Sequence, residues 1–306
     1  MTSASINPLL NALEKSFSPS PLSQINDPLL QAHGIELWLK RDDLLHPIIS
    51  GNKWRKLKYS LDNALKSGKD SLISMGGAHS NHLHALAYVG KTLNLNTHGI
   101  IRGEQPSTLT ATLKDLQDWG MQLTYISRTE YRNLRHYHDP EDLPDSKPNE
   151  YWLPEGGASA LALKGVAELV TEIDIPYDIL SAPCGTGATL AGIINAAPKN
   201  TSVIGFAALK NAQFLNDNVR NLLPSSNINW QINQEYHFGG FAKTTPELMS
   251  FIKKFADSTG IILEPLYTGK MLFGLYDLIN KNTFKPGLRI IAIHTGGLQG
   301  LRGFNE

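Results

Sequence analysis

The stretch that decides the fold is 182–192 (APCGTGATLAG), where an apolar strand turns directly into a helix. A turn of this kind points free backbone N–H groups and the positive end of the helix dipole at an anion. The glycines at 185 and 187 allow the tight turn, and the hydroxyl groups of Thr186 and Thr189 add two donors. The stretch therefore favours a phosphate site, while an ordinary strand-to-helix turn without a ligand fits the same residues.

Two common nucleotide-binding motifs do not fit the sequence. A dinucleotide-binding turn built on Gly185 and Gly187 would need a third glycine at position 190, which is Leu190. A P-loop ending at 90–92 (GKT) would need glycine at position 85, which is Ala85. The phosphate predicted to bind at this turn therefore belongs to a ligand other than a dinucleotide or a P-loop nucleotide.

Lys53 stands out in a second stretch, 50–57 (SGNKWRKL). By residue type alone a lysine is a solvated surface charge. Here Gly51 frees the backbone before the lysine, and a helical pattern begins directly after it. A lysine that attacks an aldehyde must be neutral, and the positive charges of Arg55 and Lys56 are expected to lower its pKa.

A third turn, 76–82 (GGAHSNH), opens another helix at Ser80, Asn81 and His82. Ser80 is a good N-cap, and this role explains it without any function. The same helix end could also bind a carboxylate through its free N–H groups. The histidines at 79, 82 and 84 come with no HExxH pattern or carboxylate cluster, so we expect no metal site.

The three stretches together predict a site for pyridoxal phosphate (PLP). Lys53 would form a Schiff base with the cofactor's aldehyde, and the 185–189 turn would hold its phosphate. Such a cofactor carries the difficult chemistry of an amino-acid carbanion.

The composition is that of a globular protein that acts on something small. Of the 306 residues, 41% are apolar and 18% are charged. Lys plus Arg and Asp plus Glu each number 28, so charge does not direct the chain to nucleic acid or to a membrane. The single cysteine, Cys184, permits no intrachain disulfide and no cysteine zinc cluster. Without a leader-like start or an apolar run of about 20 residues, the chain is expected to be cytoplasmic.

Short apolar runs alternate with helical patterns, which predicts an α/β protein with largely parallel sheets. The predicted strands are 36–40, 71–75, 96–101, 122–126, 178–182, 202–207, 261–263 and 289–294. The predicted helices are 54–66, 81–93, 107–118, 158–172, 188–196, 246–258 and 270–279. The stretch 128–150, rich in charge, His and Pro, is predicted to run over the surface. We expect a larger cofactor-binding lobe of residues 1–50 and 160–306, with a smaller inserted lobe, 51–159, that carries Lys53. A cleft between two lobes is a common place for a small-molecule site.

Two further turns are placed for ligand contact. Tyr267, in 264–270 (EPLYTGK), is either a packing residue or an acid–base hydroxyl. Thr295 directly follows the predicted strand 289–294, and ligands gather at the carboxyl ends of strands in open α/β sheets.

Taken together, these stretches resemble the 1-aminocyclopropane-1-carboxylate (ACC) deaminase and D-cysteine desulfhydrase family of PLP enzymes. The matching segments are 39–43 (LKRDD), 51–53 (GNK), 80–82 (SNH), 156–157 (GG), 185–187 (GTG), 267–270 (YTGK) and 295–297 (TGG). They cover nearly the whole chain in the family's order. The resemblance implies the two-lobed type II fold of PLP enzymes, with a largely parallel twisted sheet flanked by helices in each lobe and the cofactor in the cleft. It also implies a homodimer.

The resemblance implies a role for each site residue. Lys53 carries the cofactor, Ser80 faces the substrate carboxylate, and Tyr267 faces the substrate from the side opposite Lys53, which makes these three the catalytic candidates. Asn81 bonds the ring hydroxyl of the cofactor, and Thr295 lies near its pyridine nitrogen. The cofactor-binding set is Asn52, Lys53, Asn81, Cys184, Gly185, Thr186, Gly187, Ala188, Thr189, Thr295 and Gly296. The substrate-binding set is Ser80, Asn81, His82, Phe241, Tyr267 and Thr268.

Three positions separate the branches of this family. His82 stands where ACC deaminases have Gln, and Thr268 stands where they have a Glu that pairs with the pyridine nitrogen. Both residues match the desulfhydrases. Phe241 departs from both branches, which have a substrate-facing Tyr 26 residues before Tyr267.

The resemblance implies β-elimination and deamination of a small, D-configured amino acid such as D-cysteine, giving pyruvate, ammonia and sulfide. ACC deamination and a D-serine dehydratase-like activity remain alternatives. A protein that holds PLP or a metabolite with little turnover is the non-enzyme alternative.

Overall fold

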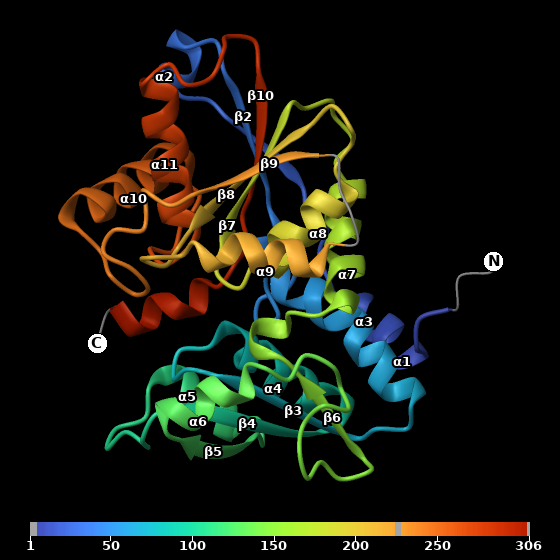
Figure 1. Ribbon diagram of the computed structural model, residues 1–306. Helices are drawn as coiled ribbons and strands as arrows, with labels where there is room; N and C mark the ends of the chain where they lie inside the picture. Colours follow the sequence, from blue (N-terminus) through green and yellow to red (C-terminus); the bar gives the residue numbers. More distant parts are fainter. Residues whose placement is uncertain (1–4, 224–227, 305–306) are drawn as a thin grey trace.

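The computed structural model describes residues 5–223 and 228–304, and these residues form two sheets (Figure 1). The larger sheet has six strands in the order β1-β2-β10-β7-β8-β9, and only the edge strand β1 is antiparallel to its neighbour. Its strands are β1 (Leu22–Ile25), β2 (Glu36–Lys40), β7 (Ile179–Cys184), β8 (Ser202–Ala207), β9 (Asn229–Asn233) and β10 (Arg289–Ile293). Every residue of β7 is buried, because helices cover both faces of the sheet at its centre.

The smaller sheet has four parallel strands in the order β5-β4-β3-β6. Its strands are β3 (Ser71–Gly76), β4 (Asn96–Arg102), β5 (Gln122–Ile126) and β6 (Glu150–Leu153). All four therefore lie between residues 71 and 153 of the chain. The division into lobes at 51–159 stays a prediction.

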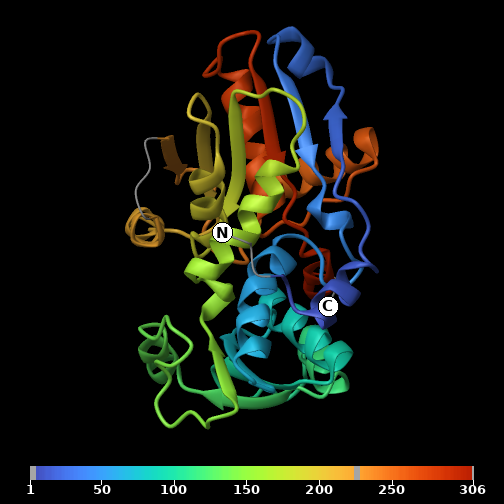
Figure 2. The same ribbon diagram turned by 90° about the vertical axis from the view of Figure 1, so that its right-hand side faces the viewer.

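Helices cover the faces of both sheets (Figure 2). They are α1 (Pro8–Glu14), α2 (Pro28–Ala32), α3 (Asn52–Lys66), α4 (Asn81–Leu93), α5 (Ala111–Asp118), α6 (Arg128–Leu134), α7 (Ala160–Thr171), α8 (Ala188–Ala196), α9 (Phe214–Leu222), α10 (Pro246–Thr259) and α11 (Thr268–Asn280). Three short 3₁₀ helices, η1 (Asp42–Leu44), η2 (Glu155–Gly157) and η3 (Leu298–Phe304), complete the fold. On the larger sheet, α10 and α11 pack into one apolar core, and α7, α8 and α9 pack into a second core. None of the helices in the described part of the chain is both long and apolar enough to cross a membrane.

The structure confirms the α/β class and seven of the eight predicted strands, and it corrects the eighth. Residues 261–263 form no strand; Ile261 and Leu263 are apolar because they pack into the core beside α10 and α11. The segment also accepts a hydrogen bond at the Ile262 carbonyl from His294 Nε2 (2.8 Å). Its apolar pattern therefore reflects burial and not pairing.

The stretch 128–150 is more structured than predicted. It holds α6 and the first residue of β6, which pairs with β3 in the smaller sheet. Tyr131 of α6 is 1% exposed and packs with Trp152 on the face of the sheet opposite α3 and α4. Because the apolar residues of this stretch are widely spaced among charged ones, the sequence pattern does not reveal that α6 packs on the sheet.

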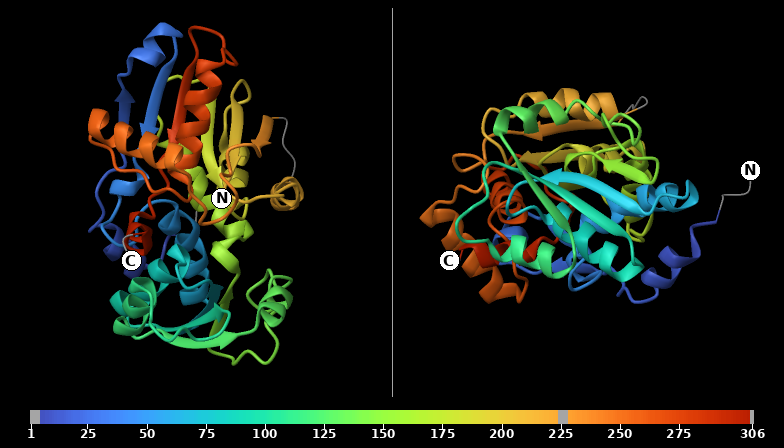
Figure 3. Two further views of the ribbon diagram at one scale, coloured as in Figure 1. Left: turned by 90° about the vertical axis from the view of Figure 1, so that its left-hand side faces the viewer. Right: turned by 90° about the horizontal axis from the view of Figure 1, so that it is seen from below.

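The two sheets meet through α3 and α7, which lie between them in Figures 1 and 3. Buried charges join these helices to the loop after β2. Arg55 of α3 bonds Asp42 (Nη2–Oδ1 3.1 Å) and Glu172 (Nη2–Oε2 2.7 Å), the residue that caps α7. Lys40 adds a 2.7 Å ion pair to Glu172. The start of α3 is therefore held in place from two segments distant in sequence, the end of β2 and the end of α7.

Close contact of α3 and α7 depends on Gly165. A Cβ atom at this position would lie 1.8 Å from the Arg55 carbonyl oxygen. Gly165→Ala is therefore expected to lower the free energy of unfolding by about 1–3 kcal/mol or more, because the two helices must separate. Urea unfolding followed by circular dichroism measures this loss. Thr171→Ala, at an exposed position of the same helix, is the control and should stay within about 0.5 kcal/mol of wild type. Equal stability of both variants would contradict the packing argument.

Candidate active site

Lys53 lies in the first turn of α3, beside the loop that follows β10. The N-cap of α3 is Gly51, whose φ of 67° suits glycine. A Cβ atom on Gly51 would lie 1.8 Å from the Thr295 carbonyl oxygen, so only glycine allows this approach. Asn52 N donates to the same carbonyl (3.3 Å). Thr295 and Gly296 therefore adjoin the turn that carries Lys53.

Burial of the Lys53 amine favours its neutral form. Burial lowers its pKa to about 8, and the nearby Glu264 carboxylate opposes this shift. The amine donates a hydrogen bond to Asn52 Oδ1. The expectation that Arg55 and Lys56 lower this pKa is wrong, because burial alone lowers it and Arg55 is engaged with Asp42 and Glu172. At pH values near 8 a large fraction of the amine is therefore neutral.

Lys56 is a site residue that we did not assign from the sequence. It follows Lys53 by three positions, so both side chains leave α3 on the same side. Its amine donates to the Gly156 carbonyl, and its pKa is well below the ordinary value because of burial and the charge of Lys53. Neither amine has a carboxylate within ion-pair distance in the described part of the chain.

The predicted phosphate turn lies against the same lysines. Its helix, α8, begins at Ala188 with Gly187 as N-cap (φ 93°), so free N–H groups end at this turn. Asn52 Nδ2 donates to Thr189 Oγ1 (2.7 Å), which ties the Lys53 turn to the phosphate turn across 137 residues. Thr186 faces η2, where a Cβ atom on Gly156 would lie 3.1 Å from its Cγ2 and 3.7 Å from Lys56 Nζ. Cys184, at the end of β7, is buried, and burial raises the pKa of its thiol to about 12.

The turn at Ser80 has the capping role predicted for it. Ser80 Oγ accepts from Leu83 N (3.2 Å) at the start of α4. Asn81 Oδ1 accepts from Gln299 Nε2 of η3, so its amide is held from the C-terminal segment. A Cβ atom on Gly297 would lie 2.6 Å from Asn81 Nδ2, which brings the 295–297 turn next to α4.

His82 is neutral and has a defined orientation. Ser74 Oγ donates to the Leu153 carbonyl (2.8 Å) and lies 2.9 Å from His82 Nε2, so Nε2 carries the hydrogen. His82 Nδ1 is then a buried acceptor with no protein partner among the described residues. Its pKa is far below the ordinary value because of burial and the charges of Lys56 and Lys53. The described residues contain no group of three or more His, Cys, Asp or Glu side chains placed to hold a metal ion.

Tyr267 and Thr268 are organised by Glu264, a second residue that we did not assign. This buried carboxylate accepts from Leu266 N (2.6 Å), Thr268 N (2.6 Å) and Thr268 Oγ1 (2.9 Å), and also from Tyr267 N. Burial raises its pKa to about 7, and these hydrogen bonds oppose the shift. The neutral Thr268 is therefore backed by a carboxylate one hydrogen bond away. In the sequence, only the position of Glu264 four residues before Thr268 could have identified it as a neighbour of Thr268.

Tyr267 faces the phosphate turn. A Cβ atom on Gly185 would lie 3.1 Å from the Tyr267 ring and 3.5 Å from its hydroxyl, so glycine makes room for this side chain. Burial and the Glu264 charge raise the pKa of the hydroxyl above its usual value. Phe241 contacts Tyr267 edge to face, with ring centroids 5.9 Å apart. It is 42% exposed.

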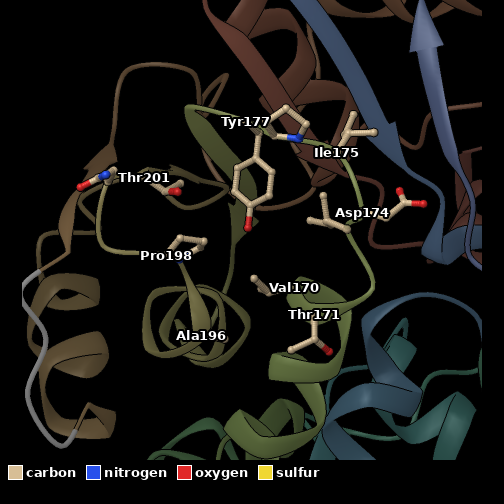
Figure 4. Close-up of a pocket in the computed structure, with 11 residues that line it drawn as sticks. Val170, Thr171, Asp174, Ile175, Tyr177, Ala196, Pro198 and Thr201 are labelled. Atoms are coloured by element: carbon tan, nitrogen blue, oxygen red, sulfur yellow. The ribbon is translucent and has the colours of Figure 1, made fainter.

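A separate surface cavity is lined by residues near the opposite ends of the strands (Figure 4). Tyr177 precedes β7 and Thr201 precedes β8, whereas the predicted site residues at 80–82, 185–189 and 295–296 follow the carboxyl ends of β3, β7 and β10. None of the predicted site residues lines this cavity. The candidate active site therefore lies at the carboxyl ends of the strands, where ligands of open α/β sheets bind.

A two-sheet α/β fold with a low-pKa lysine beside a phosphate turn is the arrangement of a PLP enzyme. Comparison with known proteins agrees: the chain belongs to the family of pyridoxal-phosphate dependent enzymes, which matches residues 14–296. The predicted cofactor, fold class and enzyme class are thereby confirmed.

The individual relatives are more specific. The chain is 33% identical to the bifunctional D-cysteine desulfhydrase/1-aminocyclopropane-1-carboxylate deaminase of Arabidopsis thaliana mitochondria, over 92% of this chain and 77% of that protein. It is 28% identical to the D-cysteine desulfhydrase of Klebsiella pneumoniae strain 342, over 96% of both chains. Among solved structures, an ACC deaminase homologue superposes with a TM-score of 0.80 at 27% identity, covering 98% of both chains. The predicted resemblance to this family is confirmed.

Proposed function

We propose that the protein catalyses β-elimination and deamination of a small D-amino acid such as D-cysteine, giving pyruvate, ammonia and sulfide. The observation that carries the proposal is that Glu264, whose charge acts on the low-pKa Lys53 amine, also bonds the backbone of Tyr267 and the hydroxyl of the neutral Thr268. A carboxylate at this position would strengthen the cofactor's electron sink, which opening an unactivated cyclopropane ring demands. Expelling sulfide, a better leaving group, does not require it.

Different residues would hold different parts of the cofactor. The backbone and hydroxyls of the 185–189 turn, with Cys184, Asn52 and the Lys56 amine, would hold the phosphate of PLP. Asn81 would bond the ring hydroxyl, and Thr295 and Gly296 would border the pyridine nitrogen. When bound, PLP supplies an electron sink for the negative charge left by the departing α-proton.

The catalytic residues would then move protons. The neutral Lys53 amine would take the α-proton, and the Tyr267 hydroxyl would exchange a proton on the opposite side of the substrate. Ser80 and the free N–H groups at the start of α4 would orient the substrate carboxylate, with His82 beside them. Phe241 would close the outer edge of the substrate site.

We also propose that the protein is a homodimer and is located in the cytoplasm. We further propose that residues 1–50 and 160–306 form the larger lobe and that residues 51–159 form the smaller one. The placement of all four strands of the smaller sheet within 71–153 supports this division. The single buried cysteine suits a reducing compartment. Sedimentation equilibrium tests the dimer, and a monomer at micromolar concentration would contradict it.

ACC deamination is the second candidate, and one observation favours it. The Glu264 carboxylate lies one hydrogen bond behind Thr268, so negative charge is not far from that position.

A panel of D-cysteine, β-chloro-D-alanine, D-serine and ACC, with L-cysteine as stereochemical control, separates the candidates by the rate of pyruvate or 2-oxobutyrate release. We expect kcat/KM to be highest for the β-substituted D-alanines with good leaving groups. Equal efficiency on ACC would overturn the proposed substrate.

Position 268 is expected to control this preference. Thr268→Glu, with or without Phe241→Tyr, should shift the ratio of kcat/KM values toward ACC by about tenfold or more, since small groups discriminate by about 1–3 kcal/mol. The new carboxylate would adjoin Glu264, so part of the gain is lost to the resulting rise in carboxyl pKa. Thr268→Ser keeps the hydroxyl that bonds Glu264 and should retain the wild-type ratio. A ratio unchanged in Thr268→Glu would contradict the role of this position.

A further inference from the structure

Gln299 lies in η3, the 3₁₀ helix that follows the 295–297 turn, and its side chain contacts the amide of Asn81. Gln299 Nε2 donates a hydrogen bond to Asn81 Oδ1 at the start of α4. Asn81 is the residue proposed to bond the ring hydroxyl of PLP, whereas Gln299 takes no part in the proposed chemistry. The two residues are 218 positions apart, so only the tertiary structure brings them together.

This hydrogen bond decides which end of the Asn81 amide is free. Oδ1 accepts from Gln299 and lies on the side of η3, where a Cβ atom on Gly300 would be 3.8 Å from it. Nδ2 lies on the side of the 295–297 turn, where a Cβ atom on Gly297 would be 2.6 Å from it. No acceptor in the described part of the chain binds Nδ2. The amide therefore turns its donor end, and not its acceptor end, toward that turn.

The free donor end borders the turn that carries Lys53. The loop after β10 accepts from Asn52 N at the Thr295 carbonyl (3.3 Å), and two residues later it adjoins the Asn81 amide. Burial and the charges of nearby lysines, Lys53 among them, hold the pKa of His82 well below its ordinary value. Since His82 directly follows Asn81, the start of α4 lies close to the Lys53 amine.

A second tether holds η3 against the smaller sheet. Arg302 Nη1 lies 3.3 Å from Asp115 Oδ1 of α5, and Arg302 Nη2 donates to the other oxygen of this carboxylate. The same carboxylate lies 2.9 Å from His84 Nε2 of α4. Arg302 Nε also donates to the backbone carbonyl of Gln299 (3.2 Å). The segment therefore stays docked without the Gln299 side chain, whose separate effect is the orientation of the Asn81 amide.

The orientation of this amide matters for the chemistry of the cofactor. When PLP is attached to Lys53, its ring hydroxyl can pass its proton to the linking nitrogen, and the form with a negatively charged ring oxygen absorbs light at longer wavelength. A hydrogen-bond donor stabilises this charged oxygen, whereas an acceptor favours the hydroxyl. Asn81 would thus favour one form with Nδ2 and the other with Oδ1.

We propose that Gln299 is a positioning residue that holds the Asn81 amide with its donor end toward the cofactor, and thereby favours the form of PLP with a charged ring oxygen. In this form the linking nitrogen carries a proton, which makes the adjoining carbon a better acceptor for the substrate amine. The inference rests on the proposed function, in which Lys53 attaches PLP and Asn81 meets the ring oxygen.

The test measures the absorbance of PLP bound to the protein without substrate, as the ratio of the long-wavelength to the short-wavelength band at one pH. In Gln299→Met the amide is free to rotate, and the ratio should fall about threefold. In Gln299→Glu the carboxylate only accepts, so Asn81 turns Nδ2 to it and Oδ1 to the cofactor. The ratio should then fall about tenfold, since hydrogen bonds to charged groups are the strong ones.

Arg302→Gln is the matched control, because it loosens the same segment without removing the partner of the Asn81 amide. It should keep the wild-type ratio. Asn81→Ala removes the donor itself and should lower the ratio, and adding Gln299→Met to this variant should change the ratio no further. A structural role of Gln299 would not produce this dependence on Asn81.

The inference is overturned if both Gln299 variants keep the wild-type ratio, or if Arg302→Gln lowers it as much as they do. A wild-type ratio in Asn81→Ala overturns it as well. If Gln299→Met does not fold, Gln299→Glu, which has nearly the same size as the native residue, decides alone. Failure of the proposed function looks different, because the wild-type protein would then release no pyruvate from the substrate panel. The absorbance of bound PLP, measured without substrate, would still test Gln299.

Discussion

Lys53→Ala is expected to abolish turnover while the protein still folds and still binds PLP through its phosphate. The variant loses the group that would attach the cofactor and the base that would take the α-proton, and a general base alone contributes about 10²–10⁴-fold. The phosphate turn, Asn52 and Lys56 remain, so the fold and the phosphate site are preserved. The rate of pyruvate release from D-cysteine measures the loss. Borohydride treatment of wild-type protein with PLP should fix a label on Lys53, found by mass spectrometry of its peptide.

Lys66→Ala is the matched control for this experiment. Lys66 lies at the end of the same helix, at the surface, and pairs with Asp62 (2.7 Å). It should keep full activity and the label on Lys53. A Lys53→Ala enzyme that works at near the wild-type rate would show that another group attaches the cofactor.

Tyr267→Phe is expected to lower kcat by about 10²–10⁴-fold on the whole panel, the usual contribution of a general acid or base. The ring remains, so its contacts with Phe241 and with the turn at Gly185 are kept. Affinity for PLP, followed by fluorescence titration, should therefore stay within a few-fold of wild type.

The control for Tyr267→Phe is Tyr276→Phe. Its hydroxyl bonds Asp27 (3.4 Å) in the core beside α10 and takes no part in the proposed site. This variant should lose some stability and no activity. If Tyr267→Phe retained its rate on every substrate, Tyr267 would be a packing residue.

Some features of the site depend on local sequence, and these were predicted. The strand-to-helix turn at 185–189 directs its N–H groups through the backbone of a few consecutive residues. The N-cap role of Ser80 and the start of α3 after Gly51 are equally local. The cofactor class followed from the combination of these three turns. Each turn alone can be explained without a ligand, whereas the three together are explained by a PLP site.

Other features depend on residues that are distant in sequence, and these were missed or predicted wrongly. Arg55 was expected to lower the pKa of Lys53, but its charge is taken up by Glu172, which is 117 residues away. The apolar residues 261–263 resemble a strand, and only the surrounding helices show that they pack without pairing. The short strand β9, which pairs with β8, was missed although its residues alternate between polar and apolar.

The sequence by itself determined the class of cofactor and the α/β fold, and it predicted the lysine that would bind the cofactor, since glycine spacing and apolar periodicity act within a few residues. Only the tertiary structure decided the electrostatics of the site. Burial of the Lys53 amine, the approach of Lys56 to the phosphate turn and the Glu264 carboxylate behind Thr268 all arise from packing between segments far apart in the chain. The pKa of a group depends on the solvent and the charges around it, and a folded chain sets both through contacts that no local pattern records.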